Sequence, residues 1–317
     1  MQSGEDTKVL VVLGPTASGK TPLAIHLARG YGGEIISQDS RQVYREMDIG
    51  TAKPTLGERA LAPHHGLDVV SPDETWTLAQ QQRLTYEMVA QLRRSGRLPM
   101  LVGGTGQYLR AILEGWTVPE VPPDLELRDA LAREAELVGT PTLHARLGEV
   151  DPEAAAKIMP NDLRRVVRAL EVWQHTGRKL SEQQRAEPPP YDTLLVGLTM
   201  ERAELYRRID ERVGRMLAAG LLDEVTELLE WGYGWELPAM RTIGYGEWRP
   251  YLQGHASVEE CAERVRLNTH NFARHQYVWF RRFREVHWLD SSSPALERDA
   301  SCLVERWIAG TPGSSDH

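Results

Sequence analysis

One stretch near the start of the sequence, Gly14–Thr21 (GPTASGKT), constrains this chain more than any other. It follows the apolar, β-branched run Lys8–Leu13, which predicts a buried parallel strand, and it leads into Thr21–Arg29, which has helical spacing. It matches G-x-x-x-x-G-K-[ST] in full, a P-loop pattern whose glycines let backbone N–H groups turn inward around phosphate oxygens. The predicted phosphate-binding residues are Gly14, Pro15, Thr16, Ala17, Ser18, Gly19, Lys20 and Thr21. Among them, Lys20 neutralises the outer phosphate and the Thr21 hydroxyl can hold Mg²⁺.

The apolar runs along the rest of the chain predict the fold class. Further buried strands are predicted at Glu34–Ile36, Leu67–Val70, Pro99–Val102, Thr193–Leu198 and Val286–Leu289, and a helix at Leu78–Arg94. Strands that alternate with helices are typical of a parallel sheet. We therefore predict an α/β fold with a P-loop NTPase-like parallel sheet and helices on both faces.

Two proline-rich joints interrupt this α/β pattern. Between Val118–Asp124 and Pro188–Pro190 the sequence has only helical patterns, rich in Ala, Glu and Arg. Linkers of this composition commonly mark domain boundaries. We predict a core made of residues 1–118 and 191–317, with C-terminal helices, and a helical insertion at 119–190. The alternative is one continuous domain without an independent insertion.

The composition excludes several classes of protein. The formal net charge of -8 is unusual for a dedicated nucleic-acid binder. The two cysteines, Cys261 and Cys302, are too few for a disulfide framework or a zinc cluster and suit a reducing cytosol. No apolar run reaches the roughly 18 residues of a membrane span, and the polar stretch Met1–Lys8 does not have the pattern of a signal peptide. We expect a cytoplasmic monomer with no membrane contact and no obligate protein partner.

A P-loop does not by itself identify its ligand. Nucleotide hydrolases also need an Asp at the end of an apolar strand, and the strand Pro99–Val102 leads into Gly103-Gly104-Thr105 instead. Asp39 is the one acidic residue at the end of an early strand. It could hold Mg²⁺, act as a general base beside the phosphates, or cap a turn.

Two segments are strongly basic although the chain as a whole is acidic. Asn161–Arg185 places Arg164, Arg165 and Arg168 on one helical face. Arg264–Arg284 interleaves six arginines with aromatic side chains, a pattern that suits phosphate contact and base stacking. Either segment alone could be a solvated helix face. Together, beside a P-loop core, they favour an anionic macromolecule as the partner.

Seven stretches, spread over nearly the full length and in family order, resemble the tRNA dimethylallyltransferases, which prenylate the adenosine just 3′ of the anticodon. They are GPTASGKT (Gly14–Thr21), ISQDSRQVYREMDIGTAKP (Ile36–Pro54), HHGLDVVSPDE (His64–Glu74), LVGGTGQYL (Leu101–Leu109), NDLRRVVRALEV (Asn161–Val172), AMRTIGYGE (Ala239–Glu247) and ARHQYVWFR (Ala273–Arg281). The chain departs from the family at Gln107, where an apolar residue is common, and around His275 and Tyr277.

This resemblance implies a reaction. It implies that dimethylallyl diphosphate, with Mg²⁺, occupies the P-loop and that its diphosphate is the leaving group. The dimethylallyl group then moves to the exocyclic amine of adenosine-37. Asp39 resembles the base that takes the proton of this amine, and Thr105 resembles the residue that positions the substrate. Together with Lys20, they are the expected catalytic residues.

The resemblance also implies a surface that binds the tRNA anticodon stem-loop. The positions that match the family's RNA contacts are Asp39, Ser40, Arg41, Gln42, Thr105, Arg128, Arg164, Arg165, Val166, Val167, Arg168, Arg241, Thr242, Ile243, Gly244, Tyr245 and Gly246. The match is least direct at Arg128. The insertion is expected to be mobile and to close over the RNA.

Two other functions stay open from the sequence. A small-molecule or nucleotide kinase would use the same loop, although the missing Asp and the two basic segments count against it. A non-catalytic RNA-binding module would carry the P-loop without using it, and would keep its function when Lys20 is replaced.

Overall fold

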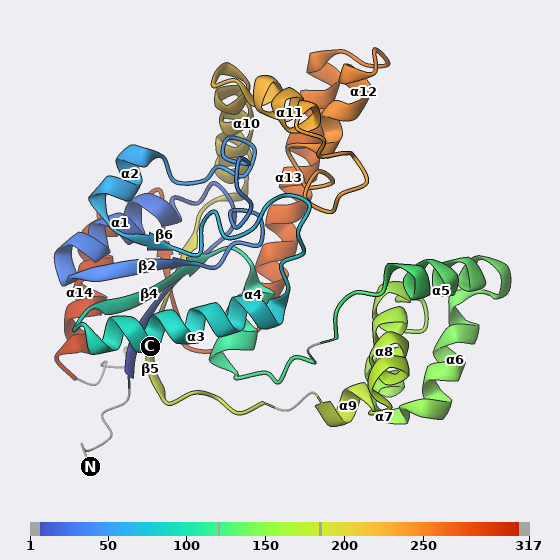
Figure 1. The fold of residues 1–317 in the computed structure, drawn as a ribbon. Coiled ribbons are helices and arrows are strands. Elements are labelled where there is room, and N and C mark those ends of the chain that lie inside the picture. The colour runs from blue at the N-terminus through green and yellow to red at the C-terminus, as the bar shows by residue number, and fades with distance from the viewer. Residues whose placement is uncertain (1–6, 120, 184–185, 311–317) are drawn as a thin grey trace. The chain divides into compact units, whose positions relative to one another are not determined.

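A computed structural model describes residues 7–119, 121–183 and 186–310 of the chain (Figure 1). It divides into two compact units, Met1–Arg110 with Pro190–His317, and Ala111–Pro189. The helix α4 (Gly106–Leu113) spans the first boundary between them. Most of Met1–Lys8, together with Arg185, lies outside the described residues, and the mobility of the segment 119–190 stays a prediction.

The first unit contains one six-stranded parallel sheet with the strand order β3-β2-β4-β1-β5-β6. The strands are β1 (Thr7–Leu13), β2 (Gly33–Ser37), β3 (His64–His65), β4 (Leu98–Gly103), β5 (Tyr191–Thr199) and β6 (Val286–Asp290). Every side chain from Val9 to Leu13 is fully buried, because β1 lies between β4 and β5 and has helices on both faces. The strands predicted at these places are confirmed, except for one.

The strand predicted at Leu67–Val70 is wrong. The chain pairs with β2 earlier, through His64 and His65, and Val70 makes only an isolated bridge with Tyr44. The reason is the backbone conformation that follows β3. Gly66 and Asp68 have φ angles of 76° and 56°, which turn the chain out of the extended conformation.

The helices of the first unit cover both faces of the sheet, which confirms the predicted fold class (Figure 1). They are α1 (Lys20–Tyr31), α2 (Leu56–Leu61), α3 (Leu78–Arg94), α10 (Arg202–Ala218), α11 (Leu221–Glu230), the short 3₁₀ helix η1 (Gly246–Trp248), α12 (Arg249–Leu252), α13 (Val258–Phe280) and α14 (Leu296–Ile308). On one face, Leu27 of α1 shares a buried cluster with Val304 of α14. On the other face α3 packs against β2 and β4. A capping box at Thr77 fixes the start of α3, so that its bounds are those predicted.

The regular structure in the described part of the second unit is helical, apart from an isolated β-bridge between Trp116 and Ala186. Its further helices are α5 (Leu125–Val138), α6 (Thr140–Val150), α7 (Pro152–Lys157), α8 (Leu163–Thr176) and α9 (Leu180–Gln183). Leu131, Leu147, Val166 and Leu170 are buried in its own apolar core. Over residues 7–119, 121–183 and 186–310, no helix combines the length and the apolar character that a membrane crossing requires.

Candidate active site

The candidate site lies where the parallel strands of the first unit end. β1 leads into the P-loop, β2 is followed by Asp39, and β4 is followed by Thr105. Because parallel strands have their carboxyl ends at one edge of the sheet, these three loops are neighbours. Hydrogen bonds and charge interactions join them, so the structure brings the predicted catalytic residues together.

The P-loop has the backbone of a phosphate cradle. Ala17 and Gly19 have left-handed φ angles of 62° and 85°, which turns successive N–H groups to one side. Gly14 is required for close approach, since a Cβ there would lie 2.9 Å from Leu198 O and 2.9 Å from Ser18 Oγ. The hydroxyl of Ser18 is fully buried and has no hydrogen-bond partner among the described residues. A buried polar group without a partner inside a cradle fits a ligand rich in acceptor oxygens.

Two cations and one carboxylate interact at this loop. Lys20 Nζ donates to Pro15 O at 2.7 Å, and Arg212 of α10 donates from Nη1 to Thr16 Oγ1 at 3.2 Å. Burial, and then the charge of Arg212, lower the pKa of Lys20 to about 7, while Asp39 opposes this shift. Burial also lowers the pKa of Arg212, and Asp39 again acts in the opposite direction. An anion of two or more charges would relieve the repulsion between Lys20 and Arg212.

Asp39 begins a tight turn at the end of β2. Its Oδ1 accepts from the N–H of Arg41 at 2.8 Å and from the N–H of Gln42 at 3.4 Å. The following N–H, from Ser40, donates to Thr105 Oγ1 at 3.2 Å. Asp39 is thus a turn-capping residue, as one of the three sequence hypotheses expected. Both bonds use Oδ1, and the carboxylate also lies close enough to Lys20 and Arg212 to influence their charges.

The remaining members of the predicted 39–42 segment hold the loop that follows β2. Gln42 Nε2 donates to Ala52 O at 3.2 Å, and its Oε1 accepts from Ser37 Oγ at 3.2 Å. Arg41 lies beside Tyr44 and opposes the burial that raises the pKa of this phenol. Gln42 therefore serves the shape of the site through the backbone of Ala52 and the side chain of Ser37, while Arg41 places a positive charge near it.

The predicted segment Arg241–Gly246 forms a turn that packs against the loop 48–52. Tyr245 is fully buried, and its hydroxyl donates to Glu224 Oε1 at 2.6 Å. The same carboxylate accepts the N–H groups of Asp48, Ile49 and Gly50. Thr242 is also buried, and its hydroxyl has no partner among the described residues. Arg241 is exposed, whereas Ile243, Gly244 and Gly246 are buried or half-buried.

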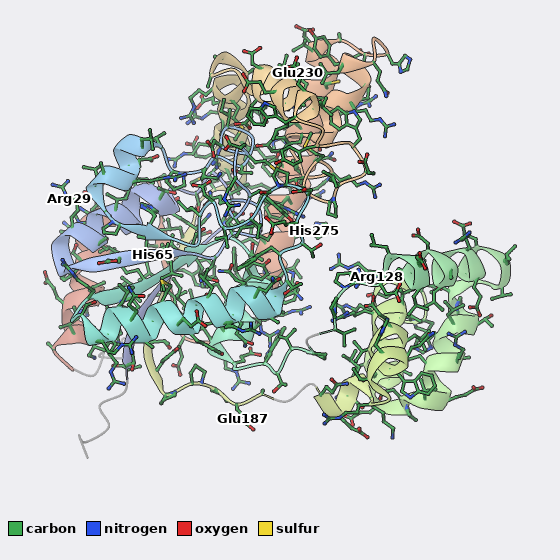
Figure 2. The ribbon with its side chains drawn as sticks, in the orientation of Figure 1. Arg29, His65, Arg128, Glu187, Glu230 and His275 are labelled. Atoms are coloured by element: carbon green, nitrogen blue, oxygen red, sulfur yellow. The ribbon has the colours of Figure 1, made fainter. Side chains whose placement is uncertain are left out.

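The predicted RNA-contacting arginines of the second unit fall into two groups, those that bind a buried carboxylate and those that are exposed. The side chain of Glu171 on α8 is fully buried and accepts from Arg128 at 2.8 Å and from Arg168 at 2.6 Å (Arg128 is labelled in Figure 2). These two guanidinium groups and the neighbouring N–H of Asp124 hold the pKa of Glu171 below its usual range. Arg164 and Arg165, in contrast, are exposed. Between them and Arg168, Val166 and Val167 are buried in the core of this unit, so their side chains serve packing.

The second basic segment, Arg264–Arg284, covers most of α13 and the turn after it. Arg274, Arg281 and Arg282 are exposed, as is His275, which is labelled on α13 in Figure 2. The guanidinium of Arg282 lies over the ring of Trp279, 4.9 Å from its centroid. This surface is basic and partly aromatic, as the sequence predicted.

Sequence reasoning missed Arg212, which contacts the P-loop from 196 residues further along the chain. One signal was present. Leu205, Ile209 and Val213 form the buried stripe of α10, and Arg212 occupies a position on that same face. A charged side chain within an apolar stripe indicates a buried site, and Arg212 meets this criterion.

Comparisons with known proteins point to one family. A family model described as IPP transferase matches residues 42–283, and one described as isopentenyl transferase matches residues 7–61. A tRNA dimethylallyltransferase of Roseiflexus sp. (strain RS-1) is 52% identical over 300 residues, which cover 95% of this chain and 98% of that protein. A tRNA dimethylallyltransferase of Herpetosiphon aurantiacus is 49% identical over 312 residues, covering 98% of each.

Solved structures give the same result. The full-length tRNA isopentenylpyrophosphate transferase of Bacillus halodurans has a TM-score of 0.70 at 37% identity, over 96% of this chain and 98% of that one. A eukaryotic dimethylallyltransferase whose structures show it acting on tRNA has a TM-score of 0.82 at 30% identity, over 98% of this chain and 81% of that one.

Proposed function

The chain belongs to the tRNA dimethylallyltransferase family, and we infer from this premise that it transfers a prenyl group to tRNA. The observation in the site that carries the function is the meeting of two cations, Lys20 and Arg212, with one carboxylate, Asp39, at a P-loop. Such a site can hold a diphosphate and accept a proton beside it. A kinase is not favoured, because the strand β4 leads into Gly103-Gly104-Thr105 where a hydrolase or kinase of this type needs a metal-binding Asp.

The donor that we propose is dimethylallyl diphosphate, and the acceptor is the exocyclic amine of adenosine-37. The loop N–H groups, Lys20 and Arg212 support this choice, because all of them can face the oxygens of a diphosphate. The target base must leave its stack to reach an allylic carbon beside the sheet. The turn Arg241–Gly246 and the exposed Arg164 and Arg165 are the proposed tRNA contacts.

In the proposed reaction two bonds form, N–C and the O–H on Asp39, and two break, C–O and N–H. The amine nitrogen attacks the allylic carbon, and the carbon–oxygen bond to the diphosphate breaks, so its electron pair stays on the leaving group. Lys20 and Arg212 stabilise the charge that develops there. Asp39 takes the proton that the amine loses, and the Thr105 hydroxyl fixes the backbone beside Asp39 through its bond with Ser40.

Mg²⁺ is proposed with the donor. Over the described residues, no group of three or more His, Cys, Asp or Glu side chains is placed to hold a metal ion by itself. The fit therefore depends on the donor: Mg²⁺ commonly takes one or two protein ligands together with phosphate oxygens. Thr21, at the start of α1, and Ser18, whose hydroxyl has no partner among the described residues, are the residues that would meet the donor and its Mg²⁺. The ion would supply charge neutralisation of the diphosphate.

Donor affinity should fall as the pH rises through about 7, the pKa of Lys20 in the free protein. Below this pH Lys20 is a cation and attracts the diphosphate; above it the donor must bind together with a proton, and affinity falls by up to about tenfold per pH unit. Calorimetry from pH 6 to 8.5 measures this. Lys20→Met isolates the titration of the donor itself. An affinity difference between the two proteins that does not change with pH would contradict the role of Lys20.

The two groups of arginines in the second unit should respond differently to substitution. Arg165→Ala should weaken tRNA binding and reduce the slope of log affinity against log salt by about 1, because one phosphate contact is lost. Arg128→Ala should instead destabilise the unit by about 1–3 kcal/mol, because the buried Glu171 loses a charged partner. Filter binding at several salt concentrations and denaturant unfolding distinguish them. An unchanged slope for Arg165→Ala would remove it from the tRNA surface.

The proposed donor is tested by giving the protein one anticodon stem-loop and, in separate reactions, one of two labelled donors. With Mg²⁺ present, label from the allylic carbon of dimethylallyl diphosphate should enter the RNA, and γ-labelled ATP should transfer nothing. Phosphate transfer from ATP without a response to the prenyl donor would support the kinase. Full function of Lys20→Ala would support an RNA-binding module that does not use its P-loop.

A further inference from the structure

One buried amide side chain joins the two halves of the site. Gln276 lies on α13, is 5% exposed, and bonds at each end of its amide to a different loop. Its Oε1 accepts the N–H of Thr16 at 2.8 Å, and its Nε2 donates to Gly104 O at 3.0 Å. The first partner belongs to the P-loop and the second to the loop after β4. Figure 1 shows α13 as a long helix that reaches this end of the sheet.

The two partners fix the chemical type of the residue. An N–H of Thr16 requires an acceptor, and a carbonyl of Gly104 can accept a donor beside the N–H of Gly106, which already donates to it at 3.1 Å. The amide of Gln276 offers one of each in a plane. A carboxylate would place an oxygen against the carbonyl oxygen, and an apolar side chain would leave the buried N–H of Thr16 without its acceptor, which costs stability.

The loop after β4 is shaped around this side chain. A Cβ on Gly104 would lie 2.2 Å from Gln276 Nε2, so that only glycine admits the contact at this spacing. The same Cβ would lie 3.6 Å from Gly14 O, so Gly104 lies beside the start of the P-loop. Gln276 thus bonds to both loops at the point where they meet.

Each loop carries one side of the chemistry, and this part rests on the proposed function. On the diphosphate side, Thr16 Oγ1 accepts from Arg212, the cation beside Lys20. On the side of the proton acceptor Asp39, Gly104 precedes Thr105. The Oγ1 of Thr105 accepts from the N–H of Ser40, the neighbour of Asp39. We propose that Gln276 is a positioning residue that fixes the distance between the departing diphosphate and the proton acceptor Asp39.

A positioning role predicts a specific kinetic change. Gln276→Met should lower kcat by about 10–100-fold, because a misplacement of about 1 Å costs rates of this order. The donor Kd should change less than about threefold, because Lys20 and Arg212 remain in place. The same substitution at the exposed Gln253, a matched control, should leave kcat unchanged.

Gln276→Glu gives a readout that a loss of packing would not produce. A protonated carboxyl group can accept from Thr16 N and donate to Gly104 O, as the amide does, whereas a carboxylate cannot donate. The ratio of its kcat to that of the wild type should therefore rise as the pH falls, and the ratio for Gln276→Met should stay flat. Near-normal kcat for Gln276→Met, or a flat ratio for Gln276→Glu, would overturn the proposal.

Hydrogen exchange tests the positioning independently of the reaction. In the full-length protein, peptides covering Gly14–Thr21 should exchange faster in Gln276→Met than in the wild type, because the N–H of Thr16 loses its acceptor. Unchanged exchange would overturn the positioning role even if kcat fell. If the wild type transfers no prenyl group at all, the proposed function fails, and the exchange experiment still decides whether Gln276 holds the P-loop.

Discussion

Replacing Asp39 with asparagine is expected to lower kcat for prenyl transfer by about 10²–10⁴-fold, the usual contribution of a general base. Asparagine keeps the size of the side chain and its Oδ1, so the bonds from the N–H groups of Arg41 and Gln42 survive. It cannot take the proton from the amine. Single-turnover transfer of a labelled prenyl group measures the change.

The conditions of this experiment follow from the charges around Asp39. Because Asp39 raises the pKa of Lys20, Lys20 should lose its proton at a lower pH in the variant than in the wild type, so the two proteins should be compared at several pH values from 6 downward. Donor affinity should then be equal or slightly tighter, since one anion near the diphosphate is gone. Asp73→Asn, at an exposed position, is the matched control. Turnover close to that of the wild type would show that Asp39 only caps its turn.

Replacing Arg212 with alanine should lower kcat/KM by about 10²–10³-fold, the usual effect of removing one group that stabilises developing negative charge. Arg212 carries a fixed charge at the P-loop and donates to Thr16 Oγ1 at 3.2 Å. Arg212→Lys should recover only part of the loss, because lysine keeps the charge and lacks the planar fork of donors. Steady-state kinetics with donor and stem-loop RNA measure both variants.

Arg215 provides the control for this position. It lies on the same helix, three residues further along, and is exposed. Arg215→Ala removes an equal charge from α10 and should change kcat/KM little. Equal losses for the two alanine variants would mean that the general positive charge of the helix matters, and that Arg212 has no direct role at the leaving group.

Much of the fold could be predicted because it depends on local patterns. Short apolar runs identified five of the six strands, and the helical spacing of Leu78–Arg94 predicted α3 with the bounds that the structure has. The strand predicted at Leu67–Val70 failed because a run of apolar residues does not reveal left-handed backbone at Gly66 and Asp68.

The candidate site was only partly visible in the sequence. The P-loop and Asp39 could be found because each comes just after a strand, whereas Thr105 was indicated only by the resemblance to the family. The apolar stripe of α10 could mark Arg212 as a buried charge, but it could not place Arg212 at the P-loop. Arg212 and Gln276 reach this loop from 196 and 260 residues away, and only tertiary packing decides this.

Periodicity also placed Arg168 on one face with Arg164 and Arg165. It could not show that Glu171, buried on the same helix, binds Arg168 and Arg128. A helical pattern gives the direction of a side chain, whereas its charge partners depend on the packing of α5 against α8.

The central claim, prenyl transfer to one adenosine of tRNA, is tested most directly by mass analysis of the RNA product. An anticodon stem-loop with adenosine-37 is incubated with the protein, dimethylallyl diphosphate and Mg²⁺, and an otherwise identical stem-loop carries guanosine at that position. We predict that only the adenosine RNA gains the mass of one dimethylallyl group in place of a hydrogen, and that fragmentation assigns it to adenosine-37. An unchanged mass for the adenosine RNA, or equal modification of both RNAs, would contradict the account.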